Sequence, residues 1–472
     1  MVFSSLLFLF VFLPTVLGFY YLAPQRFRNV VLLGFSYLFY IWGGGGFLAL
    51  LVLSTLVDYE LGLLIARSPK YRGRLLVALS VAFNLSLLAY FKYSNFFVAK
   101  ANLALAALDI GGLPWSQVVL PLGISFFTFH KITYIVDVYR GTKKALVNVV
   151  DFALYLALFP QLIAGPIVRF HEIADQLQSR TETAEKFQHG VLRFCWGLAK
   201  KVLVANSCGE IADAVFGVSP GELNAMSAWV GVAAYTAQIY FDFSGYTDMA
   251  LGLGLMFGFR LPENFNRPYS AVSITDFWRR WHMSLTRFFR DYVYIPLGGN
   301  RLGDGRTWFN LMLVFVLCGF WHGANWTFLA WGIYHGAWLI VERVTGVGRM
   351  EATTHLFLRR FSTLAIVMIG WVFFRATNLT HAVHFLGAMF VPNNLPLPLT
   401  VELALNGRNT VTLAVAAFVV FLPRHVSGAQ FITCPATPAW SVARLAALAL
   451  VMFYAVASLA STTYNPFLYF RF

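Results

Sequence analysis

Long apolar runs separated by short polar breaks recur along the whole chain. A helix needs about 20 apolar residues to cross about 30 Å of hydrocarbon, and most of these runs approach that length. The pattern therefore predicts an all-α integral membrane protein. The predicted spans, with edges defined to within about four residues, are 3–21, 29–42, 47–66, 75–98, 119–137, 190–206, 225–241, 245–258, a pair within 308–341, 357–374, 408–422 and 441–460.

The longest apolar run, residues 308–341, contains no Asp, Glu, Lys or Arg and is too long for a single crossing. We expect it to break or fold back at residues 319–325, where two glycines flank His322 and Asn325 follows. Irregular backbone at membrane depth persists only where it is buried in protein or lines a wet cavity. Because a titratable side chain in such a position is a candidate functional group, His322 is the leading candidate for a catalytic residue.

Three roles for His322 are compatible with the residues alone. It can be structural, bonded to Asn325 or to a backbone carbonyl. It can be a ligand together with Cys318, but two ligands do not make a metal site, so no metal is expected. It can also be a general base that takes a proton from a hydroxyl attacking an activated acyl group, because an imidazole titrates near working pH.

Residues 273–292 are the clearest periodic stretch. Ser273 with Asp276 forms an N-cap signal, and the pattern predicts one helix lying at the membrane interface with its aromatic face buried. The apolar stripe consists of Ile274, Phe277, Trp278, Trp281, Leu285, Phe288, Phe289 and Tyr292. The opposite side carries Arg279, Arg280, Arg287, Arg290 and Asp291. His282 lies at the edge of the stripe, where a histidine is more often solvated or capped than catalytic.

Two carboxylates, Asp242 and Asp248, lie in apolar surroundings. Buried carboxylates are costly unless they are paired. We expect them to hold arginines of the 273–292 helix or to line a polar entrance. Ser244 between them lacks the first glycine of a serine-hydrolase elbow, which makes it a poor nucleophile.

Two further segments carry polar or helix-breaking residues. His130 and Asp137 are seven residues apart and share a helix face, for which a structural hydrogen bond is the favoured interpretation over a functional one. Residues 151–170 contain Pro160 and a Gly-Pro step at 165–166. Since proline blocks helix continuation, this segment predicts a re-entrant hairpin rather than a through-helix.

Composition and charge agree with the membrane assignment. Hydrophobic residues make up 58% of the 472 residues and charged residues 12%, against about 25% charged in a soluble domain. The net charge of +14 comes from short clusters between apolar runs, as in cytoplasmic loops that meet anionic lipids. No charge block reaches the length of a nucleic-acid-binding arm. The clusters are Arg26 and Arg28; Arg67, Lys70, Arg72 and Arg74; Arg140, Lys143 and Lys144; and Lys200 and Lys201.

The remaining motifs exclude several classes of site. Cys195, Cys208, Cys318 and Cys434 form no CxxC pair, so neither disulfides nor a zinc ribbon are expected. No phosphate-cradling loop ending in Lys-Ser/Thr occurs, which means that an acyl group would have to arrive already activated. The first apolar run has no basic n-region or small-residue cleavage site and is expected to be a retained helix.

Several long motifs, in one order along the chain, resemble the membrane-bound O-acyltransferase family. They are WRRWHMSLTRFFRDYVYIPLGGNR (278–301), CGFWHGANW (318–326), YFDFSGYTDMALGLGLMFGFRLPENFNRPY (240–269), LPLGISFFTFHKITYIVDVYRG (120–141) and FPQLIAGPIVRF (159–170). The resemblance is to the bacterial branch that O-acetylates exported polysaccharides, and it is weaker beyond residue 343.

The resemblance implies the membrane-bound O-acyltransferase (MBOAT) fold, with about eleven transmembrane helices plus re-entrant and interfacial helices around a central tunnel. Residues 1–472 would form a single multi-pass acyltransferase domain. His322 matches the family's essential histidine and His282 its second one. The motif residues expected to support them are Asn325, Trp321, Asp242, Ser244, Asp248, Asn266, Trp278, Arg279 and Arg280.

The resemblance also implies a reaction at the bacterial inner membrane. A cytoplasmic thioester, acetyl-CoA or an acyl carrier, would be the donor substrate, with no bound cofactor. The acetyl group would pass to an exported polysaccharide, alginate first and cellulose second, through a periplasmic acetyltransferase partner. D-alanyl or other acyl transfer to a cell-envelope polymer remains an alternative. A transporter or channel with a structural histidine is another, although repeated halves, which are typical of transporters, are not found.

Overall fold

The computed structural model describes residues 2–219, 221–349, 355–422, 438–462 and 464–468. The regular elements within these ranges are all helices. By their internal contacts the residues form two compact units, the first made of 1–187 with 253–262 and the second of 188–252 with 263–472.

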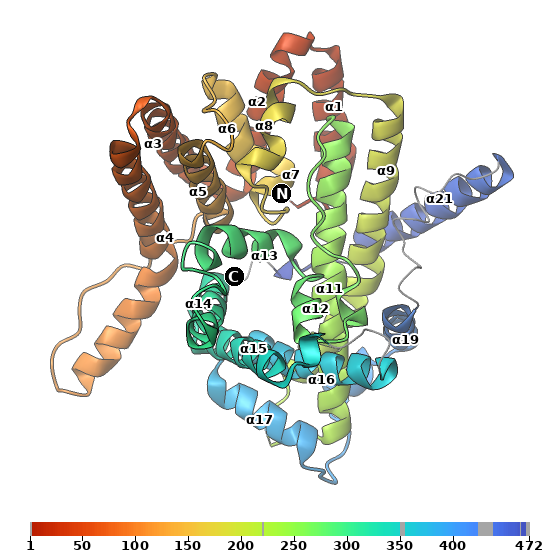
Figure 1. Cartoon of the computed structure of the whole chain (residues 1–472). Helices are drawn as coiled ribbons and strands as arrows, with labels where there is room; N and C mark the ends of the chain where they lie inside the picture. The colour runs from red at the N-terminus through yellow and green to blue at the C-terminus, as the bar shows by residue number, and fades with distance from the viewer. Residues whose placement is uncertain (1, 220, 350–354, 423–437, 463, 469–472) are drawn as a thin grey trace. The chain divides into compact units, whose positions relative to one another are not determined.

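The first unit begins with a short π-helix and continues through a series of apolar helices (Figure 1). Its elements are η1 (Phe8–Phe12), α1 (Leu13–Leu22), η2 (Gln25–Phe27), α2 (Arg28–Gly44), η3 (Gly45–Phe47), α3 (Leu48–Arg67), α4 (Lys70–Ala106), α5 (Ile124–Arg140), α6 (Val149–Ala157), α7 (Phe159–Leu162) and α8 (Phe170–Gln178). Helices α3, α4 and α5 pack side by side, and α6 packs on α2.

A buried ion pair joins the three helices α3, α4 and α5. Lys131 on α5 lies 3.6 Å from Asp58 on α3, and both side chains are fully buried. Ser80 and Asn84 on α4 donate hydrogen bonds to the same carboxylate, at 2.5 and 3.0 Å. Because a buried charge is expensive unless it is paired and hydrogen-bonded, this cluster fixes the register of the three helices.

The second unit contains the segments that carry most of the candidate site residues (Figure 1). Its elements are α9 (Ala184–Ala199), η4 (Lys200–Ala205), α10 (Asn206–Phe216), α11 (Ala225–Met256), η5 (Pro268–Ser270), α12 (Ile274–Trp278), α13 (Met283–Phe289), η6 (Arg290–Tyr294), α14 (Asp304–His322), α15 (Trp326–Thr345), η7 (Val347–Arg349), α16 (Leu356–Arg375), α17 (Leu379–Phe390), α18 (Leu399–Ala404), α19 (Gly407–Phe421) and α21 (Pro438–Ser461). The first turn of α9 and the last turn of α11 belong to the first unit.

Helices α14 and α15 form a tightly packed hairpin from the long apolar run. A Cβ added at Gly319 would collide with the Phe328 carbonyl of α15, and one added at Gly332 would collide with the Phe315 carbonyl of α14. Glycines let the two backbones approach closely, as small residues do between membrane helices. The predicted fold-back is confirmed, but the helix continues through Gly319 to His322 and breaks only at residues 323–325.

Within the described ranges, four helical segments are long and apolar enough to cross a membrane: Gln25–Arg67, Lys70–Ala106, Leu356–Arg375 and Val442–Ser461. The chain is therefore a multi-pass membrane protein.

Some predicted boundaries were wrong. The predicted pair 225–241 and 245–258 is one 32-residue helix, α11, and the predicted span 190–206 continues as η4 and α10 to Phe216. The segment 151–170 is broken into α6, α7 and the start of α8, as predicted for a non-continuous segment. Cys434 lies outside the described residues.

Candidate active site

His322 is the last residue of α14, and its side chain is almost completely buried, at 4% exposure. Aromatic rings surround the imidazole at close range. The ring centroids of Trp321, Trp331 and Phe374 lie 4.8, 5.2 and 5.1 Å from its own, all steeply inclined to it. These rings come from α14, α15 and α16, so the packing of three helices sets the orientation of the imidazole.

Asn325, three residues beyond the end of α14, has a structural role. Its side chain caps α15 by accepting a hydrogen bond from the Thr327 amide at 3.2 Å. Its Nδ2 donates to the Thr377 carbonyl at 2.9 Å. An N-cap of this kind stabilises a helix by about 1 kcal/mol. Asn325 therefore supports His322 by fixing the turn that follows it.

His282 lies at a break between α12 and α13, where the sequence pattern predicted one continuous helix. Its backbone is left-handed, with φ +43° and ψ +53°, an uncommon conformation for a residue other than glycine. The amides of Met283 and Ser284 donate to the carbonyl and side-chain oxygens of Asn264, at 2.9 and 3.1 Å. These bonds hold the break open, and such local strain is common at functional sites.

His282 is completely buried at this break, whereas the helical pattern predicted a position at the edge of the apolar stripe. Its ring lies edge-on to Phe243 of α11, with centroids 4.7 Å apart. It also lies 6.1 Å from Trp321, the ring that contacts His322. One indole is thus shared by the two histidines, which brings both predicted catalytic residues into one aromatic cluster.

The predicted stripe residue Trp278 belongs to the same cluster and links it to a third histidine. Its ring lies 5.6 Å from Trp331 and 5.3 Å from His335 of α15. His335 is fully buried, and among the described residues neither of its ring nitrogens has a hydrogen-bond partner. His335 and Trp331 were not among the residues predicted from the sequence, although both lie in the same charge-free run that identified His322.

The carboxylates of α11 form a separate ionic cluster. Asp242 pairs with Lys201 at 2.9 Å, and its other oxygen accepts the Leu468 amide at 2.9 Å. Asp248 pairs with Lys200 at 2.5 Å and with Arg193 at 2.9 Å.

The prediction that these carboxylates hold arginines of residues 273–292 was therefore wrong. Their partners are basic residues of α9 and η4. Lys200 and Lys201 were expected in a loop that meets anionic lipids, but they lie in the helix η4, where Lys201 is only 2% exposed and both lysines pair with acids. Ser244 accepts a hydrogen bond from Lys200 at 3.0 Å and belongs to this cluster.

Three of the predicted supporting residues lie at the edge of the site. Arg280 pairs with Asp276 at 2.7 Å, within its own helical turn. Arg279 is exposed. The amide of Asn266 donates to the Arg280 carbonyl at 2.9 Å, so Asn266 helps to anchor the break at His282 through its backbone.

The other histidines with polar neighbours have structural contacts. His130 accepts the Val168 amide at 3.2 Å, and Asp137 accepts from the amide and ring of His171, at 3.1 and 2.8 Å. His130 and Asp137 thus bond to separate partners. Within the part of the chain that the structure describes, no three His, Cys, Asp or Glu side chains gather as metal ligands.

Comparison with known proteins identifies the family. The model of the membrane-bound O-acyltransferase family matches residues 127–381, a region that contains His282 and His322. The chain is 44% identical to a probable alginate O-acetylase of Pseudomonas putida and 42% identical to one of Azotobacter vinelandii, in both cases over the full length of both proteins. It is also 37% identical to a peptidoglycan O-acetyltransferase of Helicobacter pylori, over 84% of this chain and 81% of that protein.

The chain belongs to the membrane-bound O-acyltransferase family. As an O-acyltransferase it uses an acyl donor and a hydroxyl acceptor. The site described above contains two buried imidazoles, those of His282 and His322. An imidazole can accept the hydroxyl proton, and the dense aromatic packing around it limits access of bulk water.

Proposed function

We propose that this protein O-acetylates an exported polysaccharide at the bacterial inner membrane, with alginate as the polymer and cellulose as the next candidate. The full-length similarity to alginate O-acetylases supports the choice of alginate. The observation that carries the proposal is the shared contact of His322 and His282 with Trp321 inside a buried aromatic cluster. In this proposal residues 1–472 work as one acyltransferase domain, with about eleven spans around a central tunnel.

His322 acts as the general base in this mechanism. It accepts the proton of an acceptor hydroxyl while the oxygen attacks the acetyl carbon of a thioester. The carbon–oxygen bond forms, the carbon–sulfur bond breaks, and the imidazolium returns its proton to the leaving thiolate. The products are an acetyl ester and a free thiol, so atoms and charge balance. His282 is a positioning residue for the thioester or the acceptor.

The donor is acetyl-CoA or an acyl-carrier thioester, delivered from the cytoplasm. The acceptor hydroxyl belongs to the polymer itself or to a periplasmic acetyltransferase partner that passes the acetyl group on. The ionic cluster of Asp242, Asp248, Lys200 and Lys201 holds α11 against η4 and α9. It supports the site by fixing the helix that carries Phe243, which contacts His282.

The test is the acetyl ester content of the polymer made by cells that carry only a variant enzyme. His322→Ala is expected to abolish the ester while the protein still inserts in the membrane at normal abundance. His384→Ala, which removes an exposed histidine of α17, is the matched control and should leave the ester unchanged. Normal acetylation in the His322→Ala strain would overturn the proposal.

The same experiment separates the rival acyl groups. Mass spectrometry of base-released acyl groups gives acetate if the proposal is correct. If base instead releases D-alanine from the cell envelope, and the His322→Ala strain lacks this D-alanine, the reaction is D-alanyl transfer and not acetylation. Solute movement through the reconstituted protein without consumption of an acyl donor would favour a transporter.

A further inference from the structure

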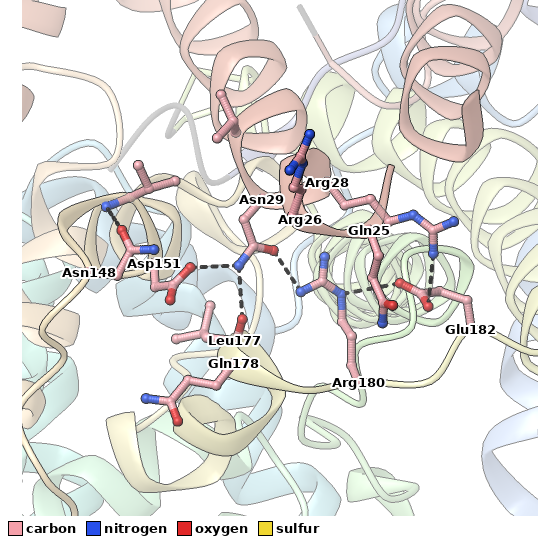
Figure 2. Close-up of a pocket in the computed structure, with 12 residues that line it drawn as sticks. Gln25, Arg26, Arg28, Asn29, Asn148, Asp151, Leu177, Gln178, Arg180 and Glu182 are labelled. Carbon is pink, nitrogen blue, oxygen red and sulfur yellow. Dashed lines mark hydrogen bonds and ion pairs between the residues drawn. The ribbon is translucent and has the colours of Figure 1, made fainter. Parts of the chain in front are cut away.

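The first unit contains a polar pocket whose lining includes none of the histidines described above. It has a volume of about 230 Å³ (Figure 2), and a water's share of liquid volume is about 30 Å³, so it can hold more than a single ordered water. Its lining comes from the α1–α2 connection and the first turn of α2, the start of α6, and the end of α8 with the α8–α9 connection. The lining residues are Gln25, Arg26, Arg28, Asn29, Val30, Asn148, Val150, Asp151, Leu177, Gln178, Arg180 and Glu182.

The floor of the pocket is a row of side chains joined by hydrogen bonds and ion pairs (Figure 2). Asn29 donates to Asp151 at 2.6 Å and accepts from Arg180 at 2.7 Å. Arg28 pairs with Glu182 at 3.1 Å. Because each carboxylate is already engaged inside this row, the row is a preformed wall rather than a set of mobile surface chains.

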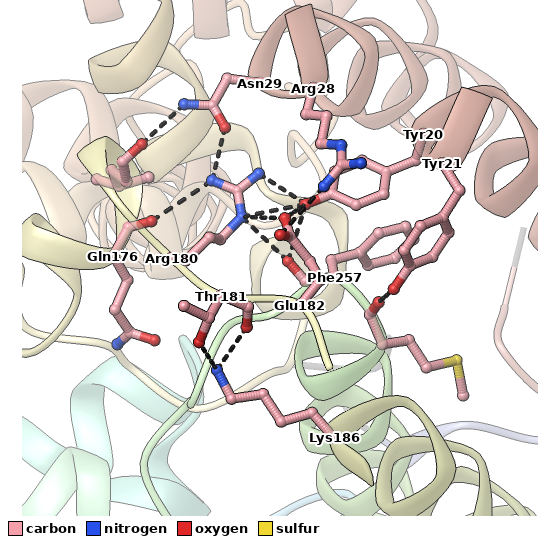
Figure 3. Close-up of polar contacts among 12 residues, drawn as sticks. Tyr20, Tyr21, Arg28, Asn29, Gln176, Arg180, Thr181, Glu182, Lys186 and Phe257 are labelled. Atoms are coloured by element: carbon pink, nitrogen blue, oxygen red, sulfur yellow. Dashed lines mark hydrogen bonds and ion pairs between the residues drawn. The ribbon is translucent and has the colours of Figure 1, made fainter. Parts of the chain in front are cut away.

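Arg180 is the fixed centre of that wall (Figure 3). Its guanidinium donates to the Tyr20 hydroxyl at 2.9 Å and to the Phe257 carbonyl at 3.0 Å, and its side chain is only 7% exposed. Tyr20 in turn donates to Glu182 at 2.6 Å. Burial raises the pKa of Glu182, but the Tyr20 hydrogen bond and the charges of Arg28 and Arg180 outweigh it, so this pKa lies below its ordinary value.

The pocket carries an excess of positive charge. Three arginines line it against two carboxylates, and Arg26 has no carboxylate partner among the residues that the structure describes. Guanidinium groups suit a phosphate oxyanion, which they can bind through two parallel hydrogen bonds.

Exposed apolar side chains flank the arginines. Leu22 is 87% exposed, Phe27 46% and Val30 50%. In a multi-pass membrane protein such side chains meet acyl chains. Asn29 at the start of α2 and Tyr59 in the second half of α3 both bond to residues at or just before the start of α6, Asp151 and Val147. The basic clusters at 26–28 and 67–74 therefore lie at the same end of α2 and α3, which the positive-inside rule assigns to the cytoplasmic leaflet. A ligand at this position would have its charged group in the pocket and its apolar part against lipid-facing residues.

We propose that this pocket binds the phosphate group of an anionic phospholipid of the cytoplasmic leaflet. The recognised chemistry is a phosphate oxyanion, held by Arg26 and Arg28, with acyl chains lying along Leu22 and Val30. Basic pockets between transmembrane helices bind lipid headgroups in this way. The site is separate from the proposed chemistry at His322 and holds whether or not that proposal does.

The test uses the purified full-length protein in a neutral detergent, with phosphatidylglycerol, phosphatidylcholine, inorganic phosphate and coenzyme A as probes. Native mass spectrometry and the thermal unfolding temperature report binding. We expect phosphatidylglycerol to bind and to stabilise the protein, and phosphatidylcholine to do neither. Arg26→Gln should weaken phosphatidylglycerol binding about fivefold, the value of one basic residue at a charged surface, and Arg26→Lys should restore most of it.

Arg72→Gln is the matched control. Both Arg26 and Arg72 are exposed. The Arg26 guanidinium lies over the Phe27 ring and the Arg72 guanidinium over the Tyr71 ring. Arg72, however, does not line the pocket. This variant should bind phosphatidylglycerol as the natural protein does. Equal binding by Arg26→Gln and Arg72→Gln would overturn the proposal. Displacement of phosphatidylglycerol by inorganic phosphate or coenzyme A would overturn the lipid assignment and make a soluble phosphate compound the ligand.

Discussion

The imidazole of His322 and the indole of Trp331 meet edge to face, with ring centroids 5.2 Å apart and an interplanar angle of 88°. This contact joins the end of α14 to the second turn of α15 and holds the ring of the proposed base. A general base acts only in one geometry, and a misplacement of about 1 Å can cost a factor of about 100 in rate. The orientation of His322 is therefore as important as its chemistry.

The contact predicts the effect of shortening Trp331. Trp331→Ala should lower the acetyl-transfer rate by about 10–100-fold, because the imidazole loses its supporting wall. Trp331→Phe keeps a ring there and should lose less. Trp308→Phe, at a partly exposed tryptophan of α14, is the control for general effects of losing an indole. A Trp331→Ala enzyme with the natural rate would show that the Trp331 ring does not orient His322.

The close approach of α14 and α15 makes Gly319 sensitive to substitution. A Cβ at this position meets the Phe328 carbonyl, whereas a Cβ at Gly305 on the same helix meets no atom within 4 Å. Gly319→Ala should cost about 1–3 kcal/mol of stability and lower the transfer rate, because His322 lies one turn further along. Gly305→Ala should change neither quantity. Thermal unfolding in detergent and a transfer assay measure the two effects, and equal behaviour of the two variants would contradict the packing described here.

Gly370 on α16 lies directly against the buried His335. A Cβ at this position would lie 2.7 Å from the His335 Nε2 atom. Gly370→Ala should therefore destabilise the protein by about 1–3 kcal/mol, and combining it with His335→Ala should cost less than the sum of the two changes. Gly387→Ala on α17, where a Cβ has open space, is the control. If the changes in the free energy of unfolding of the two single variants add up to that of the double variant, Gly370 and His335 are not in steric contact.

Glu182 predicts a pH-dependent contribution to stability. Its pKa in the folded protein lies below the ordinary value of 4.5, so the ionised form is favoured by folding. The resulting stabilisation is complete above that ordinary value and is lost as the pH falls through the lower, folded-state pKa. Glu182→Gln should lower the free energy of unfolding at pH 7 by about 1–3 kcal/mol, which a lower unfolding temperature would report. The difference in stability between this variant and the natural protein should shrink at strongly acidic pH. A difference that does not vary with pH would exclude this origin.

Local signals in the sequence predicted local features well. Ser273 caps α12 as expected, accepting the Asp276 amide at 3.0 Å. Phe277, Trp281 and Phe288 of the predicted stripe are buried even though the helix breaks between α12 and α13. Apolar periodicity predicts which side chains are buried, and this prediction is correct on both sides of the break.

Features that depend on distant partners were not predictable in the same way. The left-handed turn at His282 depends on Asn264, eighteen residues earlier, which accepts the amides of the new helix start. Helix α11 continues through residues 242–244, where the sequence predicted a gap between two spans, and Lys201, from a separate segment, neutralises Asp242 there. His335 could have been found, because the argument from a charge-free apolar run applies to it as it does to His322.

The central claim is that the imidazole of His322 takes the acceptor proton. The direct measurement is single-turnover transfer of labelled acetyl from a thioester donor to an alcohol acceptor by purified protein in liposomes. His322→Ala should lower the transfer rate by about 10²–10⁴-fold, the usual contribution of a general base, while His384→Ala retains the natural rate. A folded His322→Ala protein that transfers acetyl at the natural rate would contradict the account.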